Sequence, residues 1–280
     1  MKMGLVTGVL ASSALTIFAS CSSPEEVSDA VGVEAETTPA ASAELESRVA
    51  VDAEPVEFKD EATSDEATRD FNYSWPRQAS AIPELAKLLE QRRDAALAEQ
   101  KSEWQEALEE FAGSDCVACR NRGYGAEWQV VADLPRFLSL SSSRYTYTGG
   151  AHGNSDFDAL IWDREESAAL NPLALFTSPD AVAKAIRKPW CDGLRAEKEK
   201  RLGEAGDSSI FGGCPTLDQL NLLIGSSNGE TFDRIGLQAA PYVAGSYAEG
   251  AYEVTVPVTQ DVIDAVQPQY KEFFSVKGQD

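Results

Sequence analysis

The chain has 280 residues, with 46 acidic residues against 24 basic ones, a single histidine and a formal net charge of −22. Its 43% hydrophobic residues are enough to form a buried core. The acidity disfavours nucleic acid as a partner, because binding a phosphate backbone depends on lysine and arginine. A single histidine excludes metal sites built on two or more histidines, and we expect neither a metal nor another cofactor.

The first twenty residues (1–20) are typical of an export signal. Lys2 precedes an apolar run, GLVTGVLASSALTIFA, that is too short and too rich in small residues for a comfortable transmembrane span. The run ends in FAS before Cys21, which resembles the lipobox of bacterial lipoproteins, where the cysteine is lipidated and becomes the mature N-terminus. An ordinary signal peptide cleaved nearby is the alternative. Both predict an extracytoplasmic protein. Lipidation of Cys21 predicts a membrane anchor, and Ser22 favours the outer membrane of a Gram-negative cell.

Residues 21–70 are predicted to be a lipidated cysteine followed by a disordered acidic tether. Ser22 to Asp70 holds fifteen acidic residues against three basic ones, with Phe58 as its one aromatic residue. Such a segment cannot bury enough apolar surface to offset its chain entropy. We therefore expect one folded domain over residues 71–280.

The folded region begins with the pattern of a long amphipathic helix over residues 82–111. Apolar residues recur there at steps of three and four, Pro83 suits the first turn, and Gly113 suits the end. A second helix is predicted after Ser178 and Pro179, and Pro189 should kink or split it.

The strands are predicted from alternating apolar and polar residues. The segments AEWQVVADL, RFLSLSSSRYTYT and FDALIWD predict an antiparallel meander, and GGAHGN joins the last two. Further strands are expected at LNLLIG, RIGLQAA and YEVTVPV, with a short helix at DVIDAV. The fold class is therefore α+β, with an antiparallel meander sheet packed against the long N-terminal helix and the second, kinked helix.

Four cysteines remain after Cys21, and an even number in an oxidising compartment indicates two disulfides. We favour pairing Cys116 with Cys119 and Cys191 with Cys214. A redox dithiol at CVAC is the weaker alternative, because a thioredoxin-like site follows a strand and opens a helix.

Two motifs invite a catalytic interpretation. GSSNG matches the pattern of a hydrolase nucleophile elbow around Ser227, but the next segment has a strand pattern, and Asn228-Gly229 strongly favours a hairpin turn. His152 lies among three glycines with no recognisable catalytic partner. A turn with a buried imidazole bonded to the backbone is favoured there over direct ligand binding.

Two further stretches carry a family resemblance. YTYTGGAHGN followed by LNPLALF resembles the first signature of the DUF3298 (RsiV-like) domain, and PYVAGSYAEGAYEVTVP resembles the second. FNYSWPRQ and the helix after it are similar to the DUF4163 (PdaC N-terminal-like) region that precedes that domain. The resemblance implies an α+β, extracytoplasmic module. Known members include a lysozyme receptor and a peptidoglycan N-deacetylase whose catalytic domain needs paired histidines.

The resemblance implies a binding module of the cell envelope without a catalytic site. The expected partners are peptidoglycan or a lysozyme-like protein, together with the membrane through Cys21. The alternatives are a cell-wall hydrolase using paired carboxylates and a structural or assembly lipoprotein. Both signatures could also serve only to shape the fold. The candidate ligand-binding residues are Tyr147, Gly149, Gly150, His152 and Asn154 in the first signature and Tyr242, Gly245, Tyr247 and Gly250 in the second.

Overall fold

The computed structural model describes residues 53–203 and 213–276. The predicted export signal, Cys21 and the first part of the predicted tether lie outside the described residues. Of the helices in the described part of the chain, none is both long and apolar enough to cross a bilayer.

The end of the predicted tether is folded, which corrects the boundary placed at residue 71. β1 (Val56–Ser64) and β2 (Ala67–Trp75) form an antiparallel hairpin. Phe58 packs edge-on against Phe71, and the guanidinium of Arg93 lies 4.6 Å from the centre of the Phe58 ring. Backbone pairing and the covering of alternate side chains stabilise this acidic segment, although its composition alone predicts disorder.

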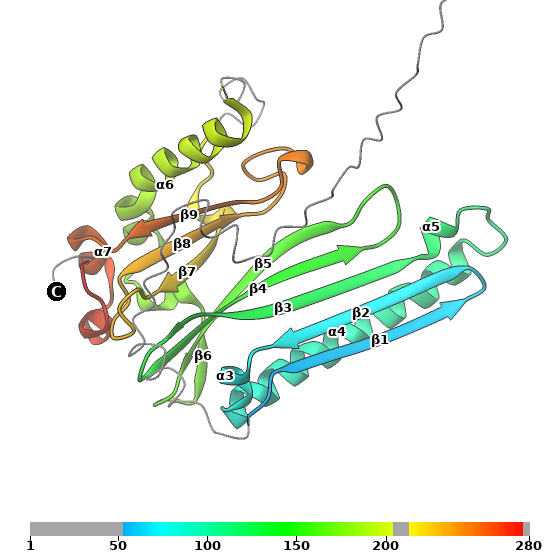
Figure 1. Cartoon of the computed structure of the whole chain (residues 1–280), viewed down its shortest axis with the longest axis horizontal. Coiled ribbons are helices and arrows are strands. Elements are labelled where there is room, and N and C mark those ends of the chain that lie inside the picture. Colours follow the sequence, from blue (N-terminus) through cyan, green and yellow to red (C-terminus); the bar gives the residue numbers. More distant parts are fainter. Residues whose placement is uncertain (1–52, 204–212, 277–280) are drawn as a thin grey trace, which may run out of the picture. The chain divides into compact units, whose positions relative to one another are not determined.

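The long helix α4 (Pro83–Glu110) confirms the predicted helix and follows the short helix α3 (Arg77–Ser80). Leu85, Leu89 and Trp104 are buried on one side of α4, which runs along β1 and β2 (Figure 1). Because α4 carries the chain back along the sheet, β2 and β3 (Arg122–Asp133) pair in parallel. The sheet is therefore mixed, which corrects the prediction of a purely antiparallel meander.

The predicted meander itself is confirmed after this crossover. β3, β4 (Phe137–Tyr147) and β5 (Asn154–Asp163) pair antiparallel, and β6 (Ala168–Leu170) completes a six-stranded sheet in the order β1-β2-β3-β4-β5-β6. Between α4 and β3, the short helix α5 (Val117–Arg120) contains Cys119, which is bonded to Cys116.

A second sheet of three strands lies beside the first and was not predicted as a separate sheet. It consists of β7 (Asn221–Gly225), β8 (Arg234–Ala239) and β9 (Tyr252–Pro257). Helices α6 (Pro179–Leu202) and α7 (Gln260–Ala265) pack together, and α6 packs on β9. Short 3-10 helices lie at Pro172–Leu175, Leu217–Gln219, Tyr247–Glu249 and Pro268–Phe273.

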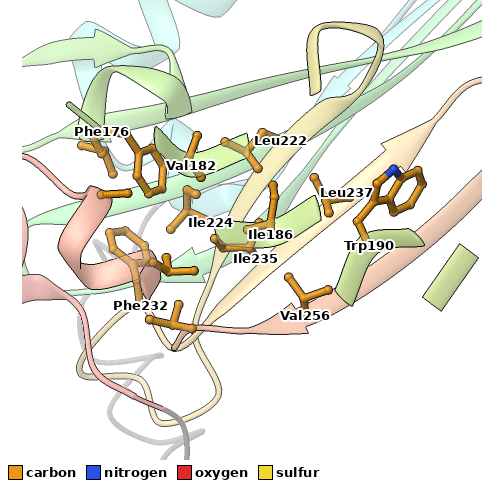
Figure 2. Close-up of a cluster of buried hydrophobic side chains, with 14 of the residues drawn as sticks. Phe176, Val182, Ile186, Trp190, Leu222, Ile224, Phe232, Ile235, Leu237 and Val256 are labelled. Atoms are coloured by element: carbon orange, nitrogen blue, oxygen red, sulfur yellow. The ribbon is translucent and has the colours of Figure 1, made fainter. Parts of the chain in front are cut away.

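The six-stranded sheet has a hydrophobic core on each face. α4 covers one face, over Phe71, Trp128 and Leu140. On the other face, Phe137 and Ile161 pack into a larger core with the three-stranded sheet and α6. Figure 2 shows this second core, where side chains from α6, β7, β8 and β9 meet: Val182, Ile186, Trp190, Leu222, Ile224, Ile235, Leu237 and Val256.

Helix α6 continues through Pro189, so the predicted split does not occur. Ile186 and Trp190, on either side of the proline, are both buried in the core, which holds the two halves of the helix in place. The disulfide between Cys191 and Cys214 ties α6 to the segment before β7, as the favoured pairing predicted. The Trp190 indole donates a hydrogen bond to the carbonyl of the adjacent Pro215.

Candidate functional site

The face of the six-stranded sheet opposite α4 changes character along β4. Near the start of β4 this face carries Phe137, which belongs to the core, whereas further along it carries Ser143 and the 44% exposed Tyr145. Gly125 on β3 and Ser155 on β5 flank this part of the strand. Small and polar residues therefore leave a shallow floor beyond the edge of the core.

The loop between β8 and β9 stands beside this floor and forms a cleft of about 660 Å³. Its walls include Tyr145 and Phe157 from the sheet and Pro241 and Tyr247 from the loop. The floor and rim are polar, with Asn72, Ser74, Glu127, Ser143 and Ser155. Concave sites that combine aromatic walls with a few polar groups are typical of ligand-binding sites.

The two signature segments meet beside this cleft. The imidazole of His152 stacks on the ring of Tyr247, with 3.8 Å between ring centres and an interplanar angle of 18°. Its Nδ1 lies 2.8 Å from the carbonyl oxygen of Gly153, and its Nε2 lies 3.4 Å from the hydroxyl of Tyr242. Because a carbonyl can only accept, Nδ1 carries a proton, and in the neutral imidazole Nε2 is then the acceptor that faces the Tyr242 hydroxyl.

The prediction for His152 was right about the backbone bond and wrong about burial. The side chain is exposed, because its ring packs against Tyr247 at the surface and not inside a turn. Direct participation in ligand binding was the alternative interpretation for His152, and its exposed position makes this chemically possible.

Tyr242 adopts an unusual backbone conformation for a bulky residue. Its φ is 72°, and its side chain is 49% exposed. A tyrosine with a positive φ is a genuine outlier, and such backbone strain is concentrated at binding and catalytic sites. The turn is closed by the Tyr242 amide, which donates to the carbonyl of Gly245 at 2.9 Å. The loop therefore holds this ring outward, within 5.8 Å of the Tyr247 ring centre.

Other candidate residues of the signatures shape the two loops. The Tyr147 hydroxyl donates to the carbonyl of Gly150 and closes the β4–β5 turn. Gly149 has a φ of 97° and lies against the backbone of Cys119, so a side chain there would be both strained and crowded. Gly245 is packed against Glu249 and Tyr252, Gly250 has a positive φ, and Asn154 opens β5 opposite Thr146.

Charged side chains hold the loop between β8 and β9 in place. The Glu249 carboxylate accepts hydrogen bonds from the Ser246 amide and the Tyr252 hydroxyl, each at 2.7 Å. Burial alone would raise the pKa of Glu249, but these bonds lower it below its usual value. Burial, together with the bond to Glu249, raises the pKa of Tyr252 to about 12. Arg201 of α6 donates to the carbonyls of Glu249 and Ala251 and covers the Tyr252 ring.

Sequence reasoning missed Tyr145, Glu249 and Arg201. Tyr145 could have been found, because alternation in β4 places it on the same face as Tyr147. Its ring also lies over Gly153, where an added Cβ would be 2.3 Å from the ring carbon Cζ. Arg201 carries no local signal, because its contacts are some fifty residues away in the sequence.

The alternative catalytic motifs occupy structural positions. Ser227 lies in the β7–β8 turn, where its amide and hydroxyl both bond to Asp233, so the predicted hairpin is confirmed. Asp156 and Asp158 share one face of β5, as paired carboxylates would, but each bonds to an arginine. Neither is held in the apolar surroundings that a general acid needs.

The fold and the cleft define the chain as an α+β protein with two sheets and a surface site lined by aromatic residues. Two solved structures share this fold. A member of the DUF3298 family from Bacteroides fragilis NCTC 9343 has a TM-score of 0.53 and 17% identity, covering 81% of this chain and 98% of its own. A DUF3298 family protein from Pseudomonas aeruginosa PAO1 has a TM-score of 0.51 and 14% identity, covering 80% and 97%.

The chain therefore has the DUF3298 fold, which confirms the resemblance seen in its sequence. The family model described as Deacetylase PdaC matches residues 62–155, from β1 to the start of β5. No curated protein matches the chain. The assignment of a DUF4163 region stays a prediction.

Proposed function

We propose that the chain is an extracytoplasmic binding module, anchored through a lipidated Cys21, that recognises a cell-wall glycan at the cell envelope. The observation that carries this proposal is the meeting of both signature segments, where His152 contacts Tyr242 and Tyr247 beside a cleft that Tyr247 lines. Segments that served only to shape the fold would have little reason to hold aromatic rings toward solvent.

The chemistry of the cleft suits a sugar chain. Tyr145 and Tyr242 are the exposed large hydrophobic side chains among the described residues. Aromatic rings stack on the C–H faces of sugar rings, and hydroxyl and amide groups bond to sugar hydroxyls. Asn72, Ser74, Ser143 and Ser155 supply such polar groups along the floor of the cleft.

The loop between β8 and β9 is held in place by contacts within the protein, which supports binding without a large change in its conformation. Arg201, Glu249 and Tyr252 fix the loop between β8 and β9 through hydrogen bonds that need no ligand. A pre-ordered site loses less conformational entropy when its ligand binds. Glu127 and Asp156 both line the cleft, but Asp156 is paired with Arg144, so the lining carries little net charge. Binding of an uncharged glycan should therefore depend little on salt.

Binding of the full-length, oxidised protein to insoluble peptidoglycan would test the proposal, at about 50 and about 500 mM salt. We expect saturable binding that resists salt, and no release of soluble fragments. Tyr247→Ala and Tyr145→Ala should each weaken binding about 5- to 10-fold, the loss expected from one aromatic contact. The matched variants Tyr247→Phe and Tyr145→Phe keep the ring and should bind nearly as the wild type does.

Other results would replace the proposal. Release of soluble muropeptides would show a hydrolase. Binding to a basic lysozyme, but not to peptidoglycan, would show a protein receptor, and its strong salt dependence would reflect the acidic surface. Binding to neither would leave an assembly role for the lipoprotein.

A further inference from the structure

A second hollow, of about 590 Å³, lies on the other face of the six-stranded sheet, between α4 and strands β2–β5. It opens where the residues facing each other are small: Ala95 and Ala96 on α4, and Ala126 and Ser142 on the sheet. Nearer the start of α4, the same layer is filled by Leu85, Leu89 and Leu140. The hollow is therefore a local gap in an otherwise well-packed layer, and it is large enough for a small ligand.

A buried hydroxyl in this hollow lacks a partner. Ser142 is 1% exposed, and its Oγ has no hydrogen-bond partner among the described residues. Buried hydroxyls are nearly always bonded, so an unpaired one calls for an explanation. Tyr73 lines the same hollow, and its hydroxyl accepts a bond from the Trp128 indole at 2.9 Å, which leaves the hydroxyl proton available. Burial raises the pKa of Tyr73 to about 12, so the phenol remains a donor.

The mouth of the hollow carries unbalanced negative charge. Arg144 pairs with Asp156 at 2.6 Å and Arg92 pairs with Asp158 at 3.3 Å, so these four charges cancel. Glu99 and Glu103 also line the hollow, one turn apart on α4. Neither forms an ion pair with a cation in the described ranges 53–203 and 213–276. Two like charges at this spacing repel, and a cation between them would relieve the repulsion.

We propose that this hollow binds a small aminated polyol, such as a 2-amino sugar. Its ammonium group would lie between Glu99 and Glu103, and a neutral hydroxyl oxygen would accept hydrogen bonds from Ser142 and Tyr73. The exposed carboxylates select the charged end, and the buried hydroxyls select the neutral end. The site lies on the opposite face of the sheet from the aromatic cleft, with Ala126, Arg144 and Asp156 lining both hollows. It does not depend on the function proposed for that cleft.

Titration of the full-length, oxidised protein with glucosamine would test this site, with the indole N–H of Trp128 as the NMR reporter. N-acetylglucosamine and glucose are the matched probes, because they keep the ring and remove the positive charge. We expect saturable shifts with glucosamine and affinity at least 10-fold weaker for both neutral sugars. Glu99→Gln and Glu103→Gln should each weaken glucosamine binding about 5-fold, and Ser142→Ala should weaken it similarly.

Two control variants separate this site from other effects. Glu109→Gln changes an exposed carboxylate on the same helix outside the hollow and should leave the affinity unchanged. Tyr247→Ala, which disrupts the aromatic cleft, should also leave it unchanged. Equal binding of all three sugars, absence of a Trp128 shift at saturating glucosamine, or an equal loss with Glu109→Gln would overturn the proposal.

Discussion

Replacement of Tyr242 would separate the strain in its loop from the function of its ring. Its φ of 72° is a conformation that costs a residue other than glycine about 1–2 kcal/mol. Glycine loses about 0.5–1 kcal/mol more backbone entropy than alanine when the chain folds. Tyr242→Gly and Tyr242→Ala remove the same ring, but only the glycine variant removes the strain. We therefore expect Tyr242→Gly to be more stable than Tyr242→Ala by about 0.5–1 kcal/mol.

Urea unfolding of both variants and the wild type, in the full-length oxidised protein, measures this difference. The lost ring itself should matter little to stability, because it is 49% exposed. Peptidoglycan binding should fall by the same factor in both variants, since each lacks the ring beside His152 and Tyr247. If Tyr242→Ala proves as stable as Tyr242→Gly, the backbone is not strained at this residue. The inference that a strained backbone is kept there for binding then fails.

Three further predictions concern stability in urea unfolding. Gly193→Ala should destabilise the fold by about 1–3 kcal/mol, because the new Cβ would lie 2.4 Å from Cγ1 of Val254, and Val254→Ala should recover part of the loss. Removing the disulfide Cys191–Cys214 should lower stability by about 3 kcal/mol, against about 2 kcal/mol for Cys116–Cys119. The sequence separations are 23 and 3, and the disulfide that closes the longer loop removes more entropy from the unfolded chain. Burial alone would raise the pKa of Asp163, but hydrogen bonds from Arg136 and two backbone amides lower it below its usual value. Asp163→Asn should therefore lose about 2–3 kcal/mol at neutral pH, and this difference should shrink as the pH falls below the usual carboxyl range and wild-type Asp163 is protonated.

Periodicity in the sequence was enough to predict most elements. The long helix was expected over residues 82–111 and begins and ends within one residue of those bounds. The strands β3, β4 and β5 follow the alternation that predicted them. These patterns succeed because each element buries one face against a neighbour, and the burial repeats at the period of the element.

The first strand could not be recognised in the same way. β1 reads VEFKDEATS, whose acidic residues indicate disorder when the segment is considered alone. Its stability comes from pairing with β2 and from Arg93 over Phe58, both of which are tertiary contacts. The parallel pairing of β2 with β3 is equally non-local, because it depends on the path of α4.

The candidate site was predicted as two separate sequence signatures. Their meeting was not predictable from spacing, because ninety residues separate His152 from Tyr242. The hollow behind α4 had a faint signal in the run of three serines, Ser141 to Ser143, which interrupts the alternation of large and polar residues in β4. Only the placement of α4 shows that Ser142 faces a gap and not solvent.

The two cores on opposite faces of one sheet have a consequence for how the protein opens. Leu138 and Leu140 of β4 face α4, while the intervening strand residue Ser139 lies on the face of the larger core and is 1% exposed. Detaching α4 would leave the backbone of β4 paired to both neighbouring strands and covered on the other side. The amides of residues 138–140 should therefore exchange with deuterium only through global unfolding, whereas those of β1, at the edge of the sheet, should exchange through a smaller, local opening.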